Sequence, residues 1–441
     1  MNKSLTAIAL LLALSACDTS LPAWLGGDEP QEAVLPGERI SVLEYRNRLS
    51  PDLDLKEATI DLLPAEQNSD WTSETSAQKS GYENLSVQGM RQIESASIGE
   101  GMEWETVLLT QPVIADGVLY AMDAAGHITA HNAMNLSQIK WHSDAPVLED
   151  EPEIGGGGLA YMNGVLYVTT GYGVMMAIVA EDGSLLWRQE TDVPIRSAPI
   201  AEEGRVFALT IDNQLLAHDA RTGKPLWSHR GIKESALYLG SVSPTIENGI
   251  VVAAYTSGEL YALRADDGTP LWSDTLIVPR RTSASSIMTG IDATPIVKNG
   301  VVYGISNSGL MVANLLSNGR GLWDKEIAGY HTPWVSGEYI FTITADHELT
   351  AIRRRDGMVK WVTSLRQEED GRDITPRLSG PAMVNDHILV LTDAGEMLLF
   401  DPKDGVLKQR LEIPEDVRVG PVIANGRLYL LSSDATLYAY Q

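Results

Sequence analysis

A glycine followed four residues later by a tryptophan recurs along this chain, and the recurrence limits the folds open to it. The clearest pairs are Gly183/Trp187, Gly223/Trp227, Gly268/Trp272 and Gly319/Trp323. With Trp141 and Trp361 at the two ends of the series, six tryptophans span 220 residues in five steps, a mean of 44 residues per step. This period is typical of the four-stranded blade of a β-propeller.

Each repeat also begins at a characteristic residue and contains turn dipeptides between its strands. A proline, or once a glycine, opens every unit, and eight such openings occur: Pro112, Gly158, Pro199, Pro244, Pro295, Pro333, Pro381 and Pro421. About five residues later comes a turn dipeptide such as Asn248-Gly249, which accepts the positive φ angles of a tight hairpin. Three turns and four short strands per unit predict an all-β, eight-bladed propeller of four-stranded antiparallel blades.

The last repeat is incomplete, because it begins at Pro421 and the sequence stops at Gln441 before any tryptophan strand. The phrase SDWTSE around Trp71 resembles the missing strand, so we expect this N-terminal segment to close the ring. Closure removes an open sheet edge, which is a liability for an all-β protein. The seventh repeat has Gln409 where the others have tryptophan, a difference we interpret as drift. We expect each tryptophan to pack between blades and to shield the glycine turn that precedes it.

Charge excludes one class of function. The chain has a net charge of −26 and a pI near 4.6. Nucleic-acid binding requires a basic surface to meet phosphates, so this class is disfavoured.

The first residues predict export. The apolar run Leu5 to Leu14 fits a secretory signal and is too short to span a bilayer. It leads into Leu14-Ser15-Ala16-Cys17, which resembles a bacterial lipobox, and Cys17 is the single cysteine of the chain. We therefore expect a signal peptide over 1–16 and lipidation of Cys17. The alternative is an ordinary signal peptide with a chance cysteine.

The expected organisation continues with a lipidated tether over 17–38, an N-terminal extension over 39–104 that includes the closing strand near Trp71, and the propeller over 105–441. Asp18 follows Cys17, and in enteric bacteria this resembles a signal for retention at the inner membrane. The outer membrane, facing the periplasm, is the first expectation, and the inner membrane stays open. Residues 40–68 have no assigned role and either pack on the ring or bind a partner.

The glycine–tryptophan ending and the Asn-Gly hairpin resemble the repeat named after pyrroloquinoline quinone (PQQ) enzymes. Quinoprotein dehydrogenases share this repeat, and many have two adjacent cysteines, a Ca²⁺ site and an Asp base. This chain has no cysteine beyond Cys17 and no dense Asp/Asn/Glu loop of the kind that holds calcium. His127 and His131 would lie on one strand, about 13 Å apart, without the Glu of a zinc motif. We therefore expect no enzyme activity, no metal and no cofactor.

The repeat is also similar to that of the BamB family, lipoprotein scaffolds of the outer-membrane β-barrel assembly machine. The resemblance implies docking to the periplasmic domains of the barrel-inserting subunit BamA, through loops of the fourth and fifth blades. Leu237, Leu239 and Asp292 match the family's contact positions, while Gly240 and Gly290 stand near two charged residues of the family. Arg280 or Arg281 would then supply the missing charge, and Leu237 and Leu239 also fit plain core packing.

Three interpretations stay open at this point. The chain is either such a scaffold, which acts as a monomer within a complex, or a PQQ-dependent oxidoreductase, or a propeller that serves another envelope complex. An exposed blade edge would also accept an added strand from an unfolded outer-membrane protein.

Overall fold

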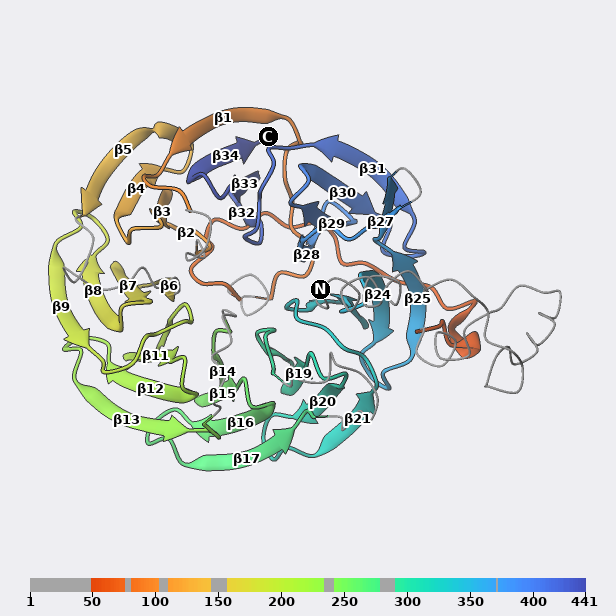
Figure 1. Ribbon diagram of the computed structural model, residues 1–441, viewed down its shortest axis with the longest axis horizontal. Coiled ribbons are helices and arrows are strands. Elements are labelled where there is room, and N and C mark those ends of the chain that lie inside the picture. The colour runs from red at the N-terminus through yellow and green to blue at the C-terminus, as the bar shows by residue number, and fades with distance from the viewer. Residues whose placement is uncertain are drawn as a thin grey trace, which may run out of the picture. The chain divides into compact units, whose positions relative to one another are not determined.

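The computed structural model describes residues 49–75, 81–102, 110–143, 157–233, 242–277, 290–369 and 372–441, all within the unit Leu49–Gln441. Among them, eight four-stranded antiparallel sheets are arranged as the blades of a ring (Figure 1). The predicted fold, an eight-bladed propeller closed by an N-terminal strand, is confirmed.

Blades A to G follow chain order, with the first strand at the centre of the ring and the fourth at the rim (Figure 1). Blade A has β2 (Val113–Ala115), β3 (Val118–Met122), β4 (Ile128–Asn132) and β5 (Asn135–Ser143), and blade B has β6 (Gly157–Met162), β7 (Val165–Thr170), β8 (Val174–Val179) and β9 (Leu185–Glu190). Blade C has β10 (Ile200–Glu202), β11 (Arg205–Leu209), β12 (Gln214–Asp219) and β13 (Pro225–Arg230), and blade D has β14 (Thr245–Glu247), β15 (Ile250–Ala254), β16 (Glu259–Arg264) and β17 (Pro270–Thr275). Blade E has β18 (Ile296–Lys298), β19 (Val301–Ile305), β20 (Met311–Leu315) and β21 (Gly321–Lys325), and blade F has β22 (Trp334–Ser336), β23 (Tyr339–Ile343), β24 (Glu348–Arg353) and β25 (Val359–Ser364). Blade G has β28 (Leu378–Val384), β29 (His387–Thr392), β30 (Glu396–Phe400) and β31 (Leu407–Glu412), and the hairpin β26 (Gln367–Glu369) and β27 (Arg372–Ile374) precedes it.

Blade H is built from both ends of the chain, and here the sequence prediction is corrected. Its strands are β32 (Val422–Ala424), β33 (Arg427–Leu431) and β34 (Thr436–Tyr440), completed by β1 (Gln92–Ser97) on the outside. The antiparallel pairing of β1 with β34 runs from Gln92 opposite Tyr440 to Ser97 opposite Thr436. The closing strand is therefore β1 and not the segment around Trp71, which pairs with Ile114 at the inner edge of blade A.

The turn dipeptides form the hairpins that the sequence predicts. In blade D, Asn248 and Gly249 have φ angles of 53° and 71°, and in blade H, Asn425 and Gly426 have 55° and 71°. Two consecutive positive φ angles are the signature of a type I′ turn, whose twist matches that of the strands it joins. Asparagine and glycine tolerate this conformation at low cost, which explains why these pairs recur.

The tryptophans pack between blades, as predicted, but each covers the glycine of the next blade and not its own. A Cβ built on Gly223 of blade C would lie 2.5 Å from the ring of Trp187 in blade B. The indole Nε1 of Trp187 donates to the Ala220 carbonyl at 2.9 Å, in the same neighbouring turn. Trp141, Trp227, Trp272, Trp323 and Trp361 repeat this arrangement.

The hydrophobic core lies between the facing surfaces of adjacent blades. One cluster joins blades A and B through residues such as Val168, and another joins blades D and E through residues such as Val252. The largest cluster runs from blade F through G and H to the inner strands of blade A, and it includes Trp71, Leu85 and Val87 of the N-terminal region. Side chains that come before β1 are therefore part of the core.

Candidate partner-binding surface

The structure describes only one of the residues expected at the partner-binding surface or at the lipid anchor. Cys17, Leu237, Leu239, Arg280 and Arg281 lie outside the described residues. Asp292 is described, in the segment that enters blade E.

The carboxylate of Asp292 faces inward. Its Oδ1 lies 3.9 Å from Nη2 of Arg196, and both side chains are only 6% exposed. The Asn307 amide donates to the other carboxylate oxygen. Arg196 comes from the segment entering blade C, so this ion pair links segments that belong to blades two apart. In the described structure Asp292 fixes the base of its loop from inside.

Polar contacts also fix the base of the connection between blades C and D. The Asn213 amide donates to the Ile232 carbonyl at 2.9 Å, and its oxygen accepts from the Thr256 amide at 3.0 Å. The carboxylate of Glu259 accepts from the Ile232 amide at 2.7 Å and from the Ser257 hydroxyl at 2.9 Å. Buried polar networks with their partners satisfied hold backbone in one conformation. This connection therefore starts from a stiff base.

Apolar side chains lie exposed at the same two bases. Ile232 is 62% exposed before the connection to blade D, and Ile277 is 36% exposed before the connection to blade E. Exposed apolar groups on a rigid base suit docking, because little ordering is required on binding. The described part of this surface offers contact area and no reactive group.

A segment of the chain itself fills the centre of the ring. Trp71 exchanges backbone hydrogen bonds with Ile114 of β2, at 2.7 and 2.8 Å, and the Thr72 carbonyl accepts from the Tyr161 amide of β6 at 2.9 Å. A few residues on, the Glu74 carboxylate accepts from the Ser243 hydroxyl at 2.7 Å, in the segment entering blade D. Blades A and D are three positions apart in the ring of eight, and Figure 1 shows described N-terminal residues, in orange, inside the ring. Residues 71–75 thus occupy the place of a propeller's central channel.

The described residues of 66–90, which we call the strap, then bind the inner ends of later blades. Glu83 forms a 3.0 Å ion pair with Lys298 of blade E, and both side chains are nearly buried. The Leu85 amide donates to the Met383 carbonyl of blade G at 3.0 Å, and the Gln88 amide donates to the Gly426 carbonyl of blade H at 2.9 Å. The strap therefore connects blades E, G and H.

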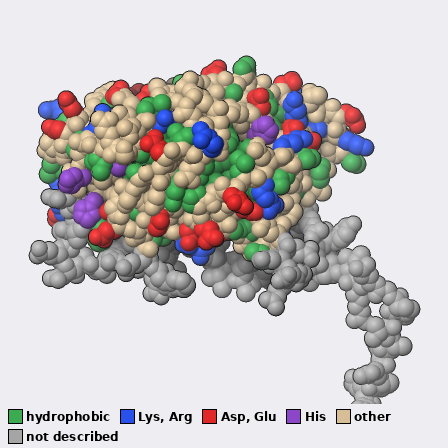
Figure 2. Space-filling view, turned by 90° about the horizontal axis from the view of Figure 1, so that it is seen from above, with side chains coloured by type: hydrophobic (Ala, Val, Ile, Leu, Met, Phe, Trp, Pro, Cys, Tyr) green, Lys and Arg blue, Asp and Glu red, His purple; other side chains and the backbone are tan. Residues whose placement is uncertain are grey.

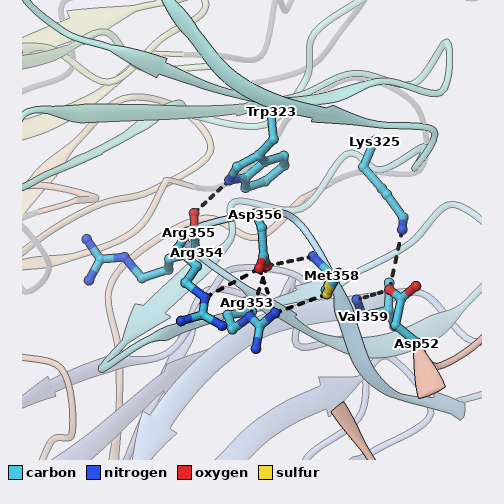
Figure 3. Close-up of polar contacts among 9 residues, drawn as sticks. All are labelled: Asp52, Trp323, Lys325, Arg353, Arg354, Arg355, Asp356, Met358 and Val359. Atoms are coloured by element: carbon cyan, nitrogen blue, oxygen red, sulfur yellow. Dashed lines mark hydrogen bonds and ion pairs between the residues drawn. The ribbon is translucent and has the colours of Figure 1, made fainter. Parts of the chain in front are cut away.

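A run of three arginines, Arg353 to Arg355, lies in the last turn of blade F, and contacts within the fold engage all three (Figure 3). Arg353 donates to Asp356 at 2.9 and 2.6 Å, and Arg354 donates to the Gly337 carbonyl at 2.8 Å. The Arg354 carbonyl accepts from the Trp323 indole at 2.6 Å. The run thus builds the joint between blades E and F.

Residues before the strap pack on the same two blades from outside (Figure 3). The carboxylate of Asp52 accepts from the Val359 amide at 2.7 Å and lies 3.5 Å from Nζ of Lys325. Leu55, at the end of the 3₁₀ helix Leu53–Leu55, is fully buried. Of the two alternatives for residues 40–68, packing on the ring holds for this described part.

Elsewhere on the surface, the described charged side chains do not gather into one site. Figure 2 shows an edge of the ring on which acidic, basic and hydrophobic side chains are intermixed. Within the described ranges, no group of three or more His, Cys, Asp or Glu side chains could hold a metal ion. A search of these same ranges finds no helix long and apolar enough to cross a membrane.

These features define a class: eight-bladed propellers of the PQQ-repeat type, here with a strap of the same chain at the centre. A family model described as outer membrane protein assembly factor BamB matches residues 115–363 and 366–441, so the chain belongs to this family. The BamB protein of Escherichia coli K12 is 25% identical over 351 residues, which cover 78% of this chain and 87% of that protein. An uncharacterized protein of Rickettsia prowazekii is 25% identical over 343 residues, covering 75% of this chain and 80% of that one.

Solved structures agree on the fold. BamB from Moraxella catarrhalis aligns with a TM-score of 0.68 at 18% identity, covering 80% of this chain and 99% of that one. Quinohemoprotein alcohol dehydrogenase from Comamonas testosteroni aligns with a TM-score of 0.62 at 12% identity, covering 85% of this chain and 81% of that one. Fold and activity separate freely, so both likenesses concern the propeller alone.

Proposed function

We propose that this protein is a non-catalytic scaffold of the β-barrel assembly machinery, which docks the periplasmic domains of BamA and aids insertion of outer-membrane proteins. The observation that carries the proposal is the family match over 115–363 and 366–441. The quinoprotein alternative has less support, because residues 71–75 fill the centre of the ring.

The docking surface proposed for BamA is formed by the connections that enter blades D and E. Leu237 and Leu239 are the proposed apolar anchors, and Arg280 or Arg281 supplies the charge. Asp292 supports this surface from within through Arg196, at 3.9 Å. The stiff bases described above favour such docking, because a partner then orders few groups on binding.

Lipidation of Cys17 is the proposed attachment to the membrane, with the propeller in the periplasm and the outer membrane as its address. Membrane fractionation of cells with the wild-type chain and with Cys17→Ala tests this. We expect the wild type in the outer-membrane fraction together with BamA, and the variant in the soluble fraction. Recovery of the wild type with inner-membrane partners only would show that Asp18 directs retention and that another envelope complex is the partner.

A further inference from the structure

The carboxyl group of Glu74 contacts the described bases of both proposed docking connections. It accepts hydrogen bonds from the side chains of Ser243 and Thr294, the first at 2.7 Å. Ser243 lies just after the connection with Leu237 and Leu239, and Thr294 lies two residues after Asp292. One side chain from the N-terminal region thus reaches the bases of two connections that lead into different blades.

Those bases are also linked to each other and to the next blade. The Ser243 amide donates to the Thr294 hydroxyl at 3.2 Å, and the Thr294 amide donates to the Thr332 hydroxyl at 3.1 Å. The segments entering blades D, E and F therefore form one chain of hydrogen bonds, and Glu74 binds its first two members. Such connected groups move together, because each link fixes the next donor.

The environment of Glu74 makes these bonds costly to lose. Desolvation raises the pKa of its carboxyl group, while the hydrogen bonds from Ser243 and Thr294 oppose this rise. The described charged pair closest in sequence to these bases is Arg196 with Asp292, and those two groups are paired with each other. Without the carboxyl group, the buried hydroxyls of Ser243 and Thr294 would lose their acceptor, and the bases that they hold would be less stable.

We propose that Glu74 is a positioning residue through which the strap fixes the described bases of the two docking connections, residues 242–247 and 290–298. The identity of the partner rests on the proposed function, whereas the coupling is a property of the isolated chain. An intact strap thereby prepares the surface for binding, so this family member uses its N-terminal region for recognition as well as for ring closure.

The test compares Glu74→Ala with Asn84→Ala in the full chain. Asn84 is a matched control in the same strap, because its buried amide donates to Asp386 of blade G at 2.6 Å, away from both connections. Hydrogen exchange of the amides over 242–247 and 290–298, with unfolding temperature alongside, reports the coupling. We expect exchange at least about tenfold faster in Glu74→Ala and unchanged in Asn84→Ala, since one lost hydrogen bond is worth about tenfold in an equilibrium.

Glu74→Gln is the rescue variant. An amide has the same shape and can still accept from Ser243, so it should restore wild-type exchange. Equal exchange in Glu74→Ala and Asn84→Ala overturns the proposal, and so does a failure of Glu74→Gln to restore it. Binding to the periplasmic domains of BamA should weaken about tenfold in Glu74→Ala alone. If exchange responds as expected while the wild type fails to bind BamA, the coupling stands and the proposed function fails.

Discussion

At the scale of single residues, the repeated glycine–tryptophan motif forms the contact between neighbouring blades. Each tryptophan requires a glycine in the next blade, because only a residue without a Cβ leaves room for the indole. Blade H has no such turn, because its outer strand β1 comes from the N-terminal region, and the preceding blade has Gln409 instead of tryptophan. Our interpretation of Gln409 as drift is therefore replaced by a structural reason. From the sequence, the packing of the tryptophans was predictable and the direction of their contact was not.

Replacing Gly223 by alanine should be strongly destabilising. The added Cβ would lie 2.5 Å from the Trp187 ring, at a residue whose φ is 71°. Overpacking and a left-handed backbone together cost about 2–5 kcal/mol. Gly204→Ala is the control, because it has a φ of 78° and no atom within 4 Å of the added Cβ, and should cost only about 1–2 kcal/mol. Urea unfolding of both variants gives the difference, and equal losses would refute the wedge role of the indole.

His331 should make the protein sensitive to acid. Burial lowers its pKa from 6.5 to about 4, with His347 adding to the effect. Because the folded pKa is depressed, the unfolded state takes up the proton first, so stability is complete above pH 6.5 and falls toward pH 4. The loss below pH 4 is up to about 3 kcal/mol. The difference in urea midpoint between wild type and His331→Phe, followed from pH 7.5 to 4, should shrink or reverse toward acid. A difference that stays constant with pH would show that His331 does not cause the loss of stability in acid.

At the scale of elements, the strands of the repeats were predictable from the sequence, whereas the strand and contacts of the N-terminal region were not. The strands of blades A to G follow from turn dipeptides and spacing, but β1 carries no tryptophan and was missed. The reason is physical: the turn between β4 and β5 of blade A consists of Ala133 and Met134 and has no glycine that an indole of blade H would cover. The Tyr429 hydroxyl of blade H donates to the Ala133 carbonyl of this turn at 2.6 Å. The segment around Trp71 matched the phrase and lies inside the ring. The strap makes scattered hydrogen bonds with blades far away in sequence, and no periodicity signals such contacts.

The ion pair of Glu83 with Lys298 should be essential for docking of the strap. Both groups are nearly buried and 3.0 Å apart, so Lys298→Met leaves a carboxylate without its cation and should cost about 3–5 kcal/mol. The double variant Glu83→Gln/Lys298→Met removes both charges and should recover at least half of this loss. Limited proteolysis should cut the strap faster in the single variant. No recovery in the double variant would mean that Lys298 acts through packing and not through charge.

At the scale of the whole molecule, one chain closes a ring by bringing its two ends together. The fold class, the number of blades and the use of an N-terminal strand were predictable, because each repeat contains recognisable turn dipeptides and the last repeat lacks its fourth strand. The docking surface was less predictable: Asp292 matched a contact position, yet its carboxylate is buried against Arg196 and Asn307. A sequence shows residue types in a loop, while the inward or outward direction of a side chain depends on blades that are distant in sequence.

A disulfide across the closing pair should stabilise the ring. Ser95 of β1 lies directly opposite Tyr438 of β34, and paired Cα atoms in antiparallel strands are within disulfide reach. Ser95→Cys/Tyr438→Cys in a Cys17→Ala background should oxidise readily and unfold at a higher temperature than its reduced form. The loop closed is long, so a gain of about 2–4 kcal/mol is expected. Failure to oxidise would place the closing strand elsewhere.

The most direct test of the account is the binding of the purified chain to the periplasmic domains of BamA, measured by calorimetry. We predict a saturable complex with a dissociation constant of about 10 μM or tighter, and a weakening of at least tenfold for Leu237→Ala/Leu239→Ala. Leu53→Ala is the control, because Leu53 is 88% exposed on the outside of the ring, and it should bind as the wild type does. No binding at about 100 μM, or equal affinity of the wild type and the double variant, would contradict the account.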